Sequence, residues 1–202
     1  MEKTFLVFLL SILAFFFSSI PFGYVIAKLK GIDIRKYGSG NIGATNVTRV
    51  LGKKYGALVL FLDAIKGAIF VILGKFFSLN LFELTIIALF AILGHMFSPF
   101  LKGKGGKGIA TALGTFIVIS PITTLFAILD FILVFLLTKI VSLSSLSAAL
   151  LFLAAFPVIE RRSTYVKEAF FIVLIIVALI FYKHKDNIKR LLKGKEYKFG
   201  QK

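Results

Sequence analysis

The sequence predicts an all-α, polytopic integral membrane protein, and three observations support this prediction. Hydrophobic residues make up 58% of the 202 residues, against about 45–50% in ordinary soluble domains. They occur in long runs, which is typical of helices in contact with lipid. The 25 Lys and Arg residues, which outweigh 9 Asp and Glu to give a formal net charge of +16, lie mostly between these runs. We therefore expect one integral membrane domain that covers residues 1–202.

The first three apolar runs are each suited to one membrane-spanning helix, which needs about 20 residues. They are Thr4–Ala27, Tyr55–Gly74 and Phe82–Phe97. The first run is longer than the apolar region of a signal peptide, which has about 7–15 residues, and no small-residue cleavage site follows cleanly before Lys28. We therefore interpret it as an uncleaved first span.

The fourth apolar run extends from Ile109 to Leu137 and is longer than one crossing needs. It contains Ser120-Pro121, and proline breaks or kinks a helix. The run therefore forms either one kinked span or two short spans. Two further runs follow, near Ser144–Ile159 and at Ala169–Tyr182.

The distribution of Lys and Arg distinguishes between these topologies, because cytoplasmic loops carry an excess of both residues. With seven spans and the N-terminus outside, most of them lie on the cytoplasmic side, in residues 28–54, 102–107, 139 and the tail from Lys183. With six spans, the basic tail would lie outside, against the rule. We predict seven transmembrane helices with a cytoplasmic C-terminus, and short or broken spans near Pro121, of which at least one does not cross fully.

The absence of cysteine excludes disulfides, thiolate catalysis and an acyl-cysteine intermediate. The positive charge could indicate nucleic-acid binding. Lys and Arg beside membrane spans are better explained by the anionic lipid surface. We therefore expect membrane lipids, and no nucleic acid, as partners, although part of the charge could serve anionic substrates.

Two glycine-rich, basic loops lie among the predicted spans, on the predicted cytoplasmic side. One is Gly38-Ser-Gly-Asn-Ile-Gly-Ala-Thr-Asn46, and the other is Lys102-Gly-Lys-Gly-Gly-Lys-Gly108. Glycine lets backbone N–H groups approach a phosphate closely, and lysine supplies counter-charge. The second loop leads into a plausible helix start at Ile109, whose dipole would favour an anion. The loops indicate binding of phosphorylated molecules, and the alternative is a pair of flexible basic turns.

Both loops match the pattern G-x-G-x-x-G, but three well-known motifs are excluded. A dinucleotide-binding fingerprint must follow a strand, whereas these loops follow membrane helices. A P-loop needs Lys-Ser/Thr after its last glycine, where this chain has Ile109. A nucleophile elbow needs glycines where Tyr37 and Asn41 flank Ser39.

Polar side chains outside the glycines provide further candidates. Arg49 could bind phosphate through two hydrogen bonds, although the Gly, Asn and Ser before it are also ordinary turn residues. His184 and Asn187 share one face of a predicted tail helix, and lipid binding by an amphipathic helix is the favoured explanation of that spacing alone. His95, at the end of a span, is more often structural, and Asp63 and Lys66 can pair with each other. The serines near Ser142 can cap a helix or hold a substrate oxygen.

Together, these segments resemble the bacterial acyl-phosphate:glycerol-3-phosphate acyltransferases. The resemblance rests on Ser39–Asn46, the Gly-His95 step, Lys104–Gly108 and His184-x-x-Asn187-Ile-x-Arg190-Leu, and it spans the whole chain. It implies that an acyl group moves from acyl phosphate to the sn-1 hydroxyl of glycerol 3-phosphate. The products would be lysophosphatidic acid and inorganic phosphate, in the first committed step of phospholipid biosynthesis.

The resemblance also implies an acyltransferase domain over residues 1–202, in the bacterial cytoplasmic (inner) membrane, with the active site facing the cytoplasm. The family uses no acyl-CoA, no metal or other cofactor, and no covalent acyl-enzyme. We expect acyl phosphate and glycerol 3-phosphate as partners and a monomer as the active form.

We assign the candidate site residues from the motifs and the resemblance together. The catalytic candidates are Ser39, Arg49, Lys104, Ser142, His184 and Asn187. The candidates for substrate and phosphate binding are Gly40, Asn41, Gly43, Thr45, Asn46, His95, Gly103, Gly105, Gly106, Lys107 and Gly108. In this hypothesis the second loop binds one phosphate through its lysines and glycine amides. Ser39, Asn41 and Arg49 bind the other phosphate and the reacting carbonyl, and either loop could hold either substrate.

The general base is not evident, because no Asp or Glu stands in a glycine motif. A substrate phosphate has a second pKa of about 6 and could accept the hydroxyl proton itself, so we expect substrate-assisted chemistry, with a histidine base as the alternative. Two other functions remain open. A small-anion transporter would place its polar groups near the membrane midplane, and a non-catalytic membrane scaffold would leave the polar loops unexplained.

Overall fold

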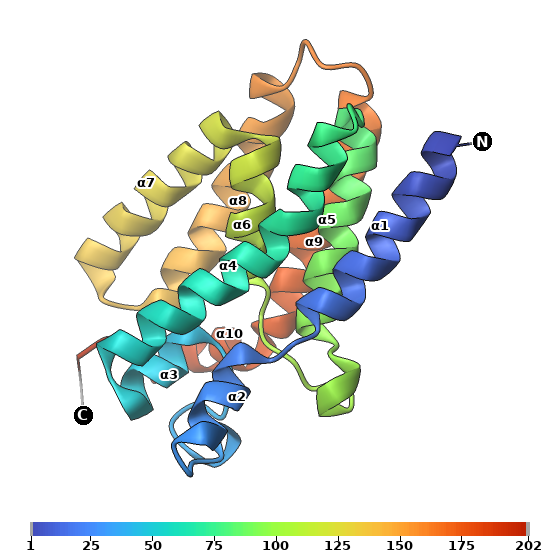
Figure 1. Cartoon of the computed structure of the whole chain (residues 1–202). Helices are drawn as coiled ribbons and strands as arrows, with labels where there is room; N and C mark the ends of the chain where they lie inside the picture. Colours follow the sequence, from blue (N-terminus) through green and yellow to red (C-terminus); the bar gives the residue numbers. More distant parts are fainter. Residues whose placement is uncertain (1, 201–202) are drawn as a thin grey trace.

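The computed structural model describes residues 2–200, in which every regular element is a helix (Figure 1). The α-helices are α1 (Glu2–Ser18), α2 (Phe22–Leu29), α3 (Ala44–Leu51), α4 (Lys53–Phe76), α5 (Leu81–Met96), α6 (Ile109–Ile119), α7 (Pro121–Thr138), α8 (Val141–Ile159), α9 (Val166–Lys183) and α10 (Lys185–Leu192). Two short 3₁₀ helices, η1 (Ile34–Lys36) and η2 (Pro99–Leu101), lie in the connections. The predicted all-α fold is confirmed.

The long helices form a bundle in which successive long helices run in opposite directions (Figure 1). Among the long helices, the main packing pairs are α4 with α6, α1 with α5, α7 with α8, and α5 with α9. The helices α2, α3 and α10 gather at one end of this bundle, together with both glycine-rich loops and the described C-terminal residues (Figure 1). Segments far apart in the sequence are therefore brought together at that end.

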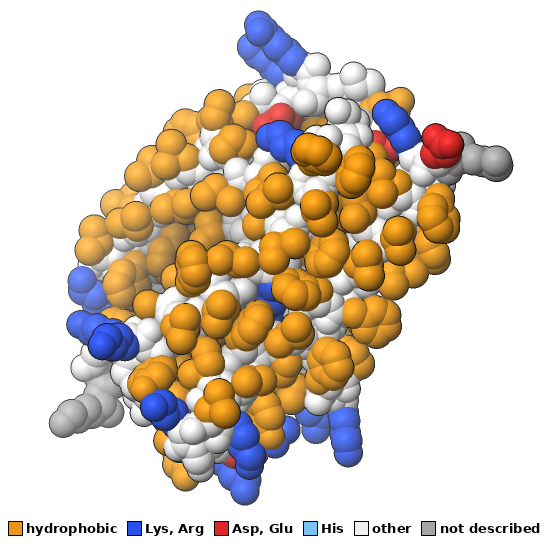
Figure 2. Space-filling view, viewed as in Figure 1, with side chains coloured by type: hydrophobic (Ala, Val, Ile, Leu, Met, Phe, Trp, Pro, Cys, Tyr) orange, Lys and Arg blue, Asp and Glu red, His pale blue; other side chains and the backbone are white. Residues whose placement is uncertain are grey.

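Within the described residues 2–200, five segments are long and apolar enough to cross a membrane. They are Glu2–Leu29, Lys53–Phe76, Leu81–Leu101, Pro121–Thr138 and Val141–Ile159. Apolar side chains cover the side of the bundle in view, while most Lys and Arg lie at its ends (Figure 2). This distribution is typical of a protein embedded in a bilayer. The count of seven spans and the orientation remain predictions.

The break at Pro121 falls where the sequence indicates it, between α6 and α7. The Ser120 hydroxyl donates to Glu160 Oε1 at 2.6 Å and lies 2.6 Å from Thr123 Oγ1. These polar contacts stabilise the junction between α6 and α7. With 11 residues, α6 is about 16 Å long. It is therefore shorter than the hydrocarbon layer of about 30 Å, as expected for one of the short spans.

The first apolar run, by contrast, contains a break that the sequence analysis did not anticipate. Helix α1 ends at Ser18, and α2 begins after Pro21. Proline disfavours the helical conformation of the residue before it, here Ile20, which explains the interruption. Two side chains bind the carbonyl groups freed there: Lys66 Nζ donates to Ile20 O at 2.7 Å, and Ser98 Oγ donates to Ser19 O at 2.6 Å.

The predicted pairing of Asp63 with Lys66 is confirmed within α4. Their side chains are 4% and 1% exposed, and Lys66 Nζ lies 2.6 Å from Asp63 Oδ1. Ser18 Oγ also donates to the carbonyl of Lys66 at 3.0 Å. This buried ion pair therefore attaches α4 to the break between α1 and α2.

Candidate functional site

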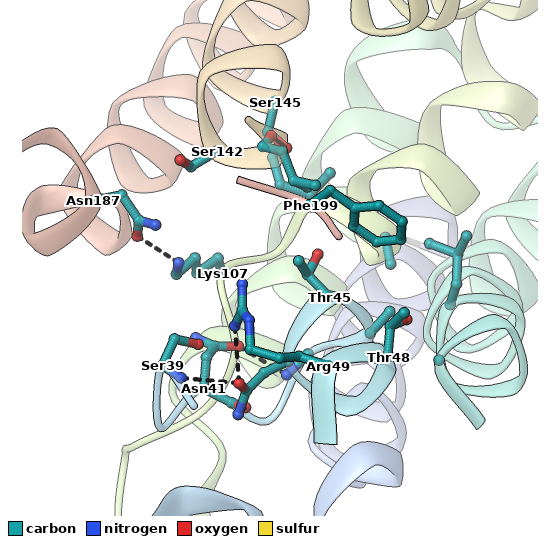
Figure 3. A pocket seen from close by; sticks show the side chains of 18 of the residues that line it. Ser39, Asn41, Thr45, Thr48, Arg49, Lys107, Ser142, Ser145, Asn187 and Phe199 are labelled. Atoms are coloured by element: carbon teal, nitrogen blue, oxygen red, sulfur yellow. Dashed lines mark hydrogen bonds between the residues drawn. The ribbon is translucent and has the colours of Figure 1, made fainter. Parts of the chain in front are cut away.

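A cavity of about 440 Å³ lies at the end of the bundle where the loops gather (Figure 3). Both glycine-rich loops, α3, α4, α7, α8 and the residues around α10 contribute to its wall. Most of the candidate residues line it: Ser39, Asn41, Gly43, Thr45, Asn46, Arg49, His95, Lys107, Gly108, Ser142, His184 and Asn187. The fold thus brings the two glycine-rich loops and the tail around His184 and Asn187 into one site.

The side chain of Asn46 organises the first glycine-rich loop. It is buried, its amide donates to Tyr37 O at 3.0 Å and to Asn41 O at 2.9 Å, and its Oδ1 accepts from Ser39 N at 2.9 Å. Asn41 Oδ1 accepts in turn from Gly43 N at 2.8 Å. These two side chains therefore stabilise the turns of the loop, which is the role that the sequence left as an alternative. Both residues also line the cavity, so a direct contact with substrate stays a prediction.

Gly40 was expected to bind substrate, but it does not line the cavity. Its φ of +71° lies in the left-handed region, which favours glycine. A Cβ there would also lie 3.1 Å from Arg35 O. Gly40 is therefore required by the course of the backbone.

Arg49 reaches the cavity from the last turn of α3. One guanidinium nitrogen, Nη1, donates to Asn46 Oδ1 at 3.1 Å. The guanidinium carbon lies 4.6 Å from the ring centroid of Tyr197. Ser39 and Arg49 lie on the same side of the cavity (Figure 3), so this side can offer a hydroxyl and a cation to an anionic ligand.

The second glycine-rich loop differs from the prediction, because its backbone is bound to the protein. Four successive N–H groups donate to carbonyl groups at the end of α5 and in the following turn. The bonds are Gly103 N to Ser98 O (2.9 Å), Lys104 N to Leu101 O (3.0 Å), Gly105 N to Met96 O (3.1 Å) and Gly106 N to His95 O (3.1 Å). The last two amides complete the hydrogen bonding of α5, and the first two bind carbonyl groups of the turn that follows it. The expectation that these four amides hold a phosphate is therefore corrected.

Lys104 and Lys107, the two lysines of this loop that were predicted to bind phosphate, differ in position. Lys104 is exposed and does not line the cavity, whereas Lys107 does. Next to Lys107, Gly108 adopts a φ of +83° and begins α6, whose first residues Ile109 and Ala110 also line the cavity. The first N–H groups of a helix lack partners within the helix and favour anions. Lys107 and the start of α6, rather than Lys104, are therefore placed to attract a phosphate.

His95 packs against the second glycine-rich loop. Its side chain is buried, and a Cβ on Gly106 would collide with its imidazole ring. Its Nδ1 lies 3.8 Å from Asp63 Oδ1. The histidine therefore fits between the buried ion pair of α4 and the loop, which explains why Gly105 and Gly106 need to be small: a Cβ on Gly105 would collide with His95 O.

A chain of polar contacts joins Lys107 to the tail. Lys107 Nζ donates to Asn187 Oδ1 at 2.5 Å (Figure 3), and Asn187 Nδ2 donates to Glu196 Oε1 at 2.8 Å. Arg190 Nε donates to the other oxygen of Glu196 at 2.8 Å. Burial lowers the pKa of Lys107 to about 8, although Glu196 acts in the opposite direction. Lys107 is therefore still mostly charged at neutral pH.

His184, next to α10, is an uncharged acceptor at neutral pH. Its Nδ1 lies 2.8 Å from Ile180 O, and a carbonyl oxygen can only accept, so Nδ1 carries the proton and Nε2 is the acceptor in the neutral ring. Burial, and then the charge of Lys107, lower the pKa of His184 to about 4. His184 can therefore accept a hydrogen bond from a ligand hydroxyl.

Ser142 is buried in the first turn of α8 and faces the cavity. Within residues 2–200, its hydroxyl has no hydrogen-bond partner. Ser144 and Ser145 differ, because they donate to the carbonyls of Ile140 and Val141. A buried hydroxyl without a partner is costly, and a ligand in the cavity could satisfy it.

An apolar cavity of about 340 Å³ continues from the polar one. Leu60, Ile109, Phe131 and Ser145 line both cavities. The apolar cavity is lined along four helices by Ile109–Phe116, Thr124–Phe131, Ser145–Phe152 and Val173–Ile180, over about 10 Å in each. Polar and apolar parts of one ligand could therefore bind side by side.

Part of the cavity wall was not predicted from the sequence, including the portion formed by the tail, which consists of Glu196, Tyr197 and Phe199. They lie in the tail beyond α10, which reads as a basic surface segment. The one signal available was Glu196 itself, the single acidic residue after Asp186 in an otherwise basic tail.

Comparisons with known proteins find relatives of this chain along nearly its whole length. The family model described as "Glycerol-3-phosphate acyltransferase" matches residues 8–194. A glycerol-3-phosphate acyltransferase of Aquifex aeolicus is 47% identical over 196 residues, which cover 94% of this chain and 97% of the relative. One of Thermus thermophilus is 40% identical over 190 residues, which cover 94% of each chain.

Two solved structures are also similar to this chain. One is the crystal structure of PlsY (YgiH), an integral membrane glycerol 3-phosphate acyltransferase, in its glycerol 3-phosphate form. It has a TM-score of 0.89 and 47% identity, and the match covers 96% of each chain. The other is the lysophosphatidic acid form of PlsY, with a TM-score of 0.85 and 46% identity over 96% of this chain and 95% of that one.

Proposed function

Because the chain belongs to the glycerol-3-phosphate acyltransferase family, we propose that it transfers an acyl group from acyl phosphate to the sn-1 hydroxyl of glycerol 3-phosphate. The products are lysophosphatidic acid and inorganic phosphate. The observation that carries this proposal is the junction of a polar cavity containing Arg49 and Lys107 with an apolar cavity between helices. Both substrates carry a phosphate, and the donor also carries an acyl chain, so the site offers a surface for each part.

The two cations bind the substrate phosphates in this proposal. Arg49 approaches from α3 and Lys107 from the start of α6, and both reach one cavity (Figure 3). Positive charges placed around a reacting phosphate stabilise the transition state without further chemistry. Asn187 holds Lys107 in place through its hydrogen bond. Either cation can serve either phosphate.

The reaction proceeds by direct attack of the sn-1 hydroxyl oxygen on the acyl carbon. The bond between the acyl carbon and the phosphate oxygen breaks, and the hydroxyl proton leaves with a phosphate. His184 has a pKa of about 4, so it is a weaker base than a phosphate monoester, whose second pKa is about 6. A general base works best with a pKa near the operating pH, which favours a substrate phosphate as proton acceptor.

His184 and Ser142 position the reacting groups in this scheme. The free Nε2 of His184 accepts a hydrogen bond from the attacking hydroxyl and so directs its oxygen. The unpartnered hydroxyl of Ser142 donates to the acyl carbonyl oxygen, where negative charge develops. Neither residue forms a covalent intermediate.

The acyl chain lies in the apolar cavity between α6, α7, α8 and α9. Both glycine-rich loops, α3 and the tail around α10, which contribute polar groups to the cavity, lie at one end of the bundle (Figure 1), which favours an enzyme at the membrane surface over an anion transporter. We further propose that residues 1–202 form one domain with seven spans in the bacterial inner membrane. The site then faces the cytoplasm, where soluble glycerol 3-phosphate is found. One monomer supplies all residues of the site.

A donor comparison tests this proposal. Purified protein in detergent receives glycerol 3-phosphate with either acyl phosphate or acyl-CoA, and both inorganic phosphate and lysophosphatidic acid are measured. We expect equal amounts of the two products from acyl phosphate and none from acyl-CoA. Turnover with acyl-CoA, or phosphate release that does not need glycerol 3-phosphate, would contradict the proposal. Folded Arg49→Ala protein is the control for contaminating activity.

A further inference from the structure

After α10 the chain runs along the wall of the polar cavity, in a segment that we call the C-terminal strap (Lys195–Phe199). At one end, Lys195 N donates to Arg190 O at 2.8 Å. At the other end, Phe199 N donates to Lys139 O at 2.7 Å, and the Phe199 ring packs against Phe135 with 5.5 Å between centroids. The strap is thus fixed both to α10 and to the turn between α7 and α8.

Tyr197, near the middle of the strap, contacts two arginines. The guanidinium carbon of Arg49 lies 4.6 Å from its ring centroid, and that of Arg190 lies 5.4 Å away. Arg190 is itself held by the neighbouring Glu196 at 2.8 Å. The ring is therefore supported from the strap and from α10, and it presents a face to Arg49.

This contact leaves Arg49 able to bind a ligand. Stacking on an aromatic ring uses the flat face of the guanidinium, whereas hydrogen bonds to phosphate leave from its edge. The edge is partly engaged by Asn46 Oδ1 at 3.1 Å. The ring and Asn46 together restrict how the guanidinium can turn, and a restricted side chain loses less entropy when a ligand binds.

We propose that Tyr197 is a positioning residue that holds Arg49 in the orientation needed to bind a substrate phosphate. The strap, which lines the cavity through Glu196, Tyr197 and Phe199, then forms part of the phosphate site. The link to glycerol 3-phosphate rests on the proposed function, whereas the link to phosphate itself does not. A ring is required at this position, but not the tyrosine hydroxyl.

The test compares Tyr197→Leu with Tyr197→Phe. We expect Tyr197→Leu to raise the KM for glycerol 3-phosphate about two- to fivefold with little change in kcat, which is the fold-change for a loss of about 0.5–1 kcal/mol in an exposed cation–π contact. Tyr197→Phe keeps the ring and should keep the KM of the wild type. If the phenylalanine variant loses as much as the leucine variant, or if neither changes the KM, the proposal is overturned.

The chain offers a matched control in Tyr24. The guanidinium carbon of Arg35 lies 4.7 Å from its ring centroid, and neither residue lines the cavity. Tyr24→Leu removes the same kind of contact outside the site and should leave the KM unchanged. An equal rise of KM in this control would show a general effect of tyrosine loss and would overturn the specific role of Tyr197.

A measurement without turnover separates this proposal from the proposed function. Inorganic phosphate is the probe, and its affinity is read from the rise in melting temperature across a concentration series. Tyr197→Leu should weaken phosphate binding about two- to fivefold, but not when Arg49 is already alanine. Phosphate binding with this pattern but without acyl transfer would refute only the proposed function. A leucine effect that persists in Arg49→Ala protein, or wild-type protein that does not respond to phosphate, would refute the role of Tyr197.

Discussion

Replacing Asp63 with asparagine should destabilise the protein strongly, because it leaves the ammonium of Lys66 buried without a counter-charge. The two side chains are 4% and 1% exposed and 2.6 Å apart. Removing one partner of such a buried pair costs about 3–5 kcal/mol. For a chain of this size, a loss of 1 kcal/mol lowers Tm by about 2–4 °C. Asp63→Asn should therefore lower Tm by about 6–20 °C.

The double variant Asp63→Leu/Lys66→Met removes both charges and keeps a similar side-chain volume. It therefore separates the effect of an unpaired charge on stability from the effect of packing. Apolar residues of similar volume often replace a buried ion pair with little loss. Here the double variant also gives up the bond from Lys66 Nζ to Ile20 O, and an unsatisfied buried carbonyl costs about 1–3 kcal/mol. The double variant should therefore be less stable than the wild type but more stable than Asp63→Asn.

Thermal unfolding in one detergent, followed by intrinsic fluorescence and by acyl transfer after cooling, measures this order. Tm values in the order wild type, double variant, Asp63→Asn would support a structural ion pair. A double variant that melts below Asp63→Asn would refute this reasoning. Activity that is lost in the double variant while its Tm is retained would instead indicate that Asp63 or Lys66 acts in the reaction.

Three further predictions follow from the site. The kcat/KM for glycerol 3-phosphate should fall as the pH rises above about 8, because Lys107, whose pKa is about 8, then loses its charge. Lys107→Arg should remove this fall, since arginine stays charged. A pH–rate profile that is the same in Lys107→Arg as in the wild type would count against Lys107. His184→Gln should lower kcat by less than about 10²-fold, whereas a loss near 10⁴-fold, the upper range for acid–base catalysis, would identify His184 as the base. Gly106→Ala should destabilise the protein by about 1–3 kcal/mol through collision with His95, as measured by thermal unfolding, and unchanged stability would show that the loop can move away.

Local sequence signals predicted the features that depend on a few neighbouring residues. The apolar runs gave the long helices, Pro121 gave the break between α6 and α7, and the spacing of Asp63 and Lys66 gave their pairing. The break at Pro21 carried the same signal as Pro121. It was missed because the length of the first run is suited to a single span, so nothing in that length indicated a break.

Features that depend on the tertiary fold could not be predicted in this way. The glycines of the second loop suggested phosphate binding, but they are needed because the loop folds back onto the end of α5 and His95. Likewise, Tyr197 gains its contact with Arg49 only because the tail returns to α3. Sequence spacing describes neighbours along a helix, and it does not describe which distant segment a loop will meet.

If acyl transfer occurs in the cavity lined by Arg49 and Lys107, two lysines of the second glycine-rich loop should differ in their effect on the reaction. Lys107 lines the cavity, and Lys104 is exposed outside it. Acyl transfer from acyl phosphate to glycerol 3-phosphate is measured for Lys107→Ala and Lys104→Ala. We expect kcat/KM to fall about 10- to 150-fold in Lys107→Ala, as for a lost hydrogen bond to a charged group of about 1.5–3 kcal/mol, and much less in Lys104→Ala. Equal losses, or a larger loss for Lys104→Ala, would contradict this account of the site.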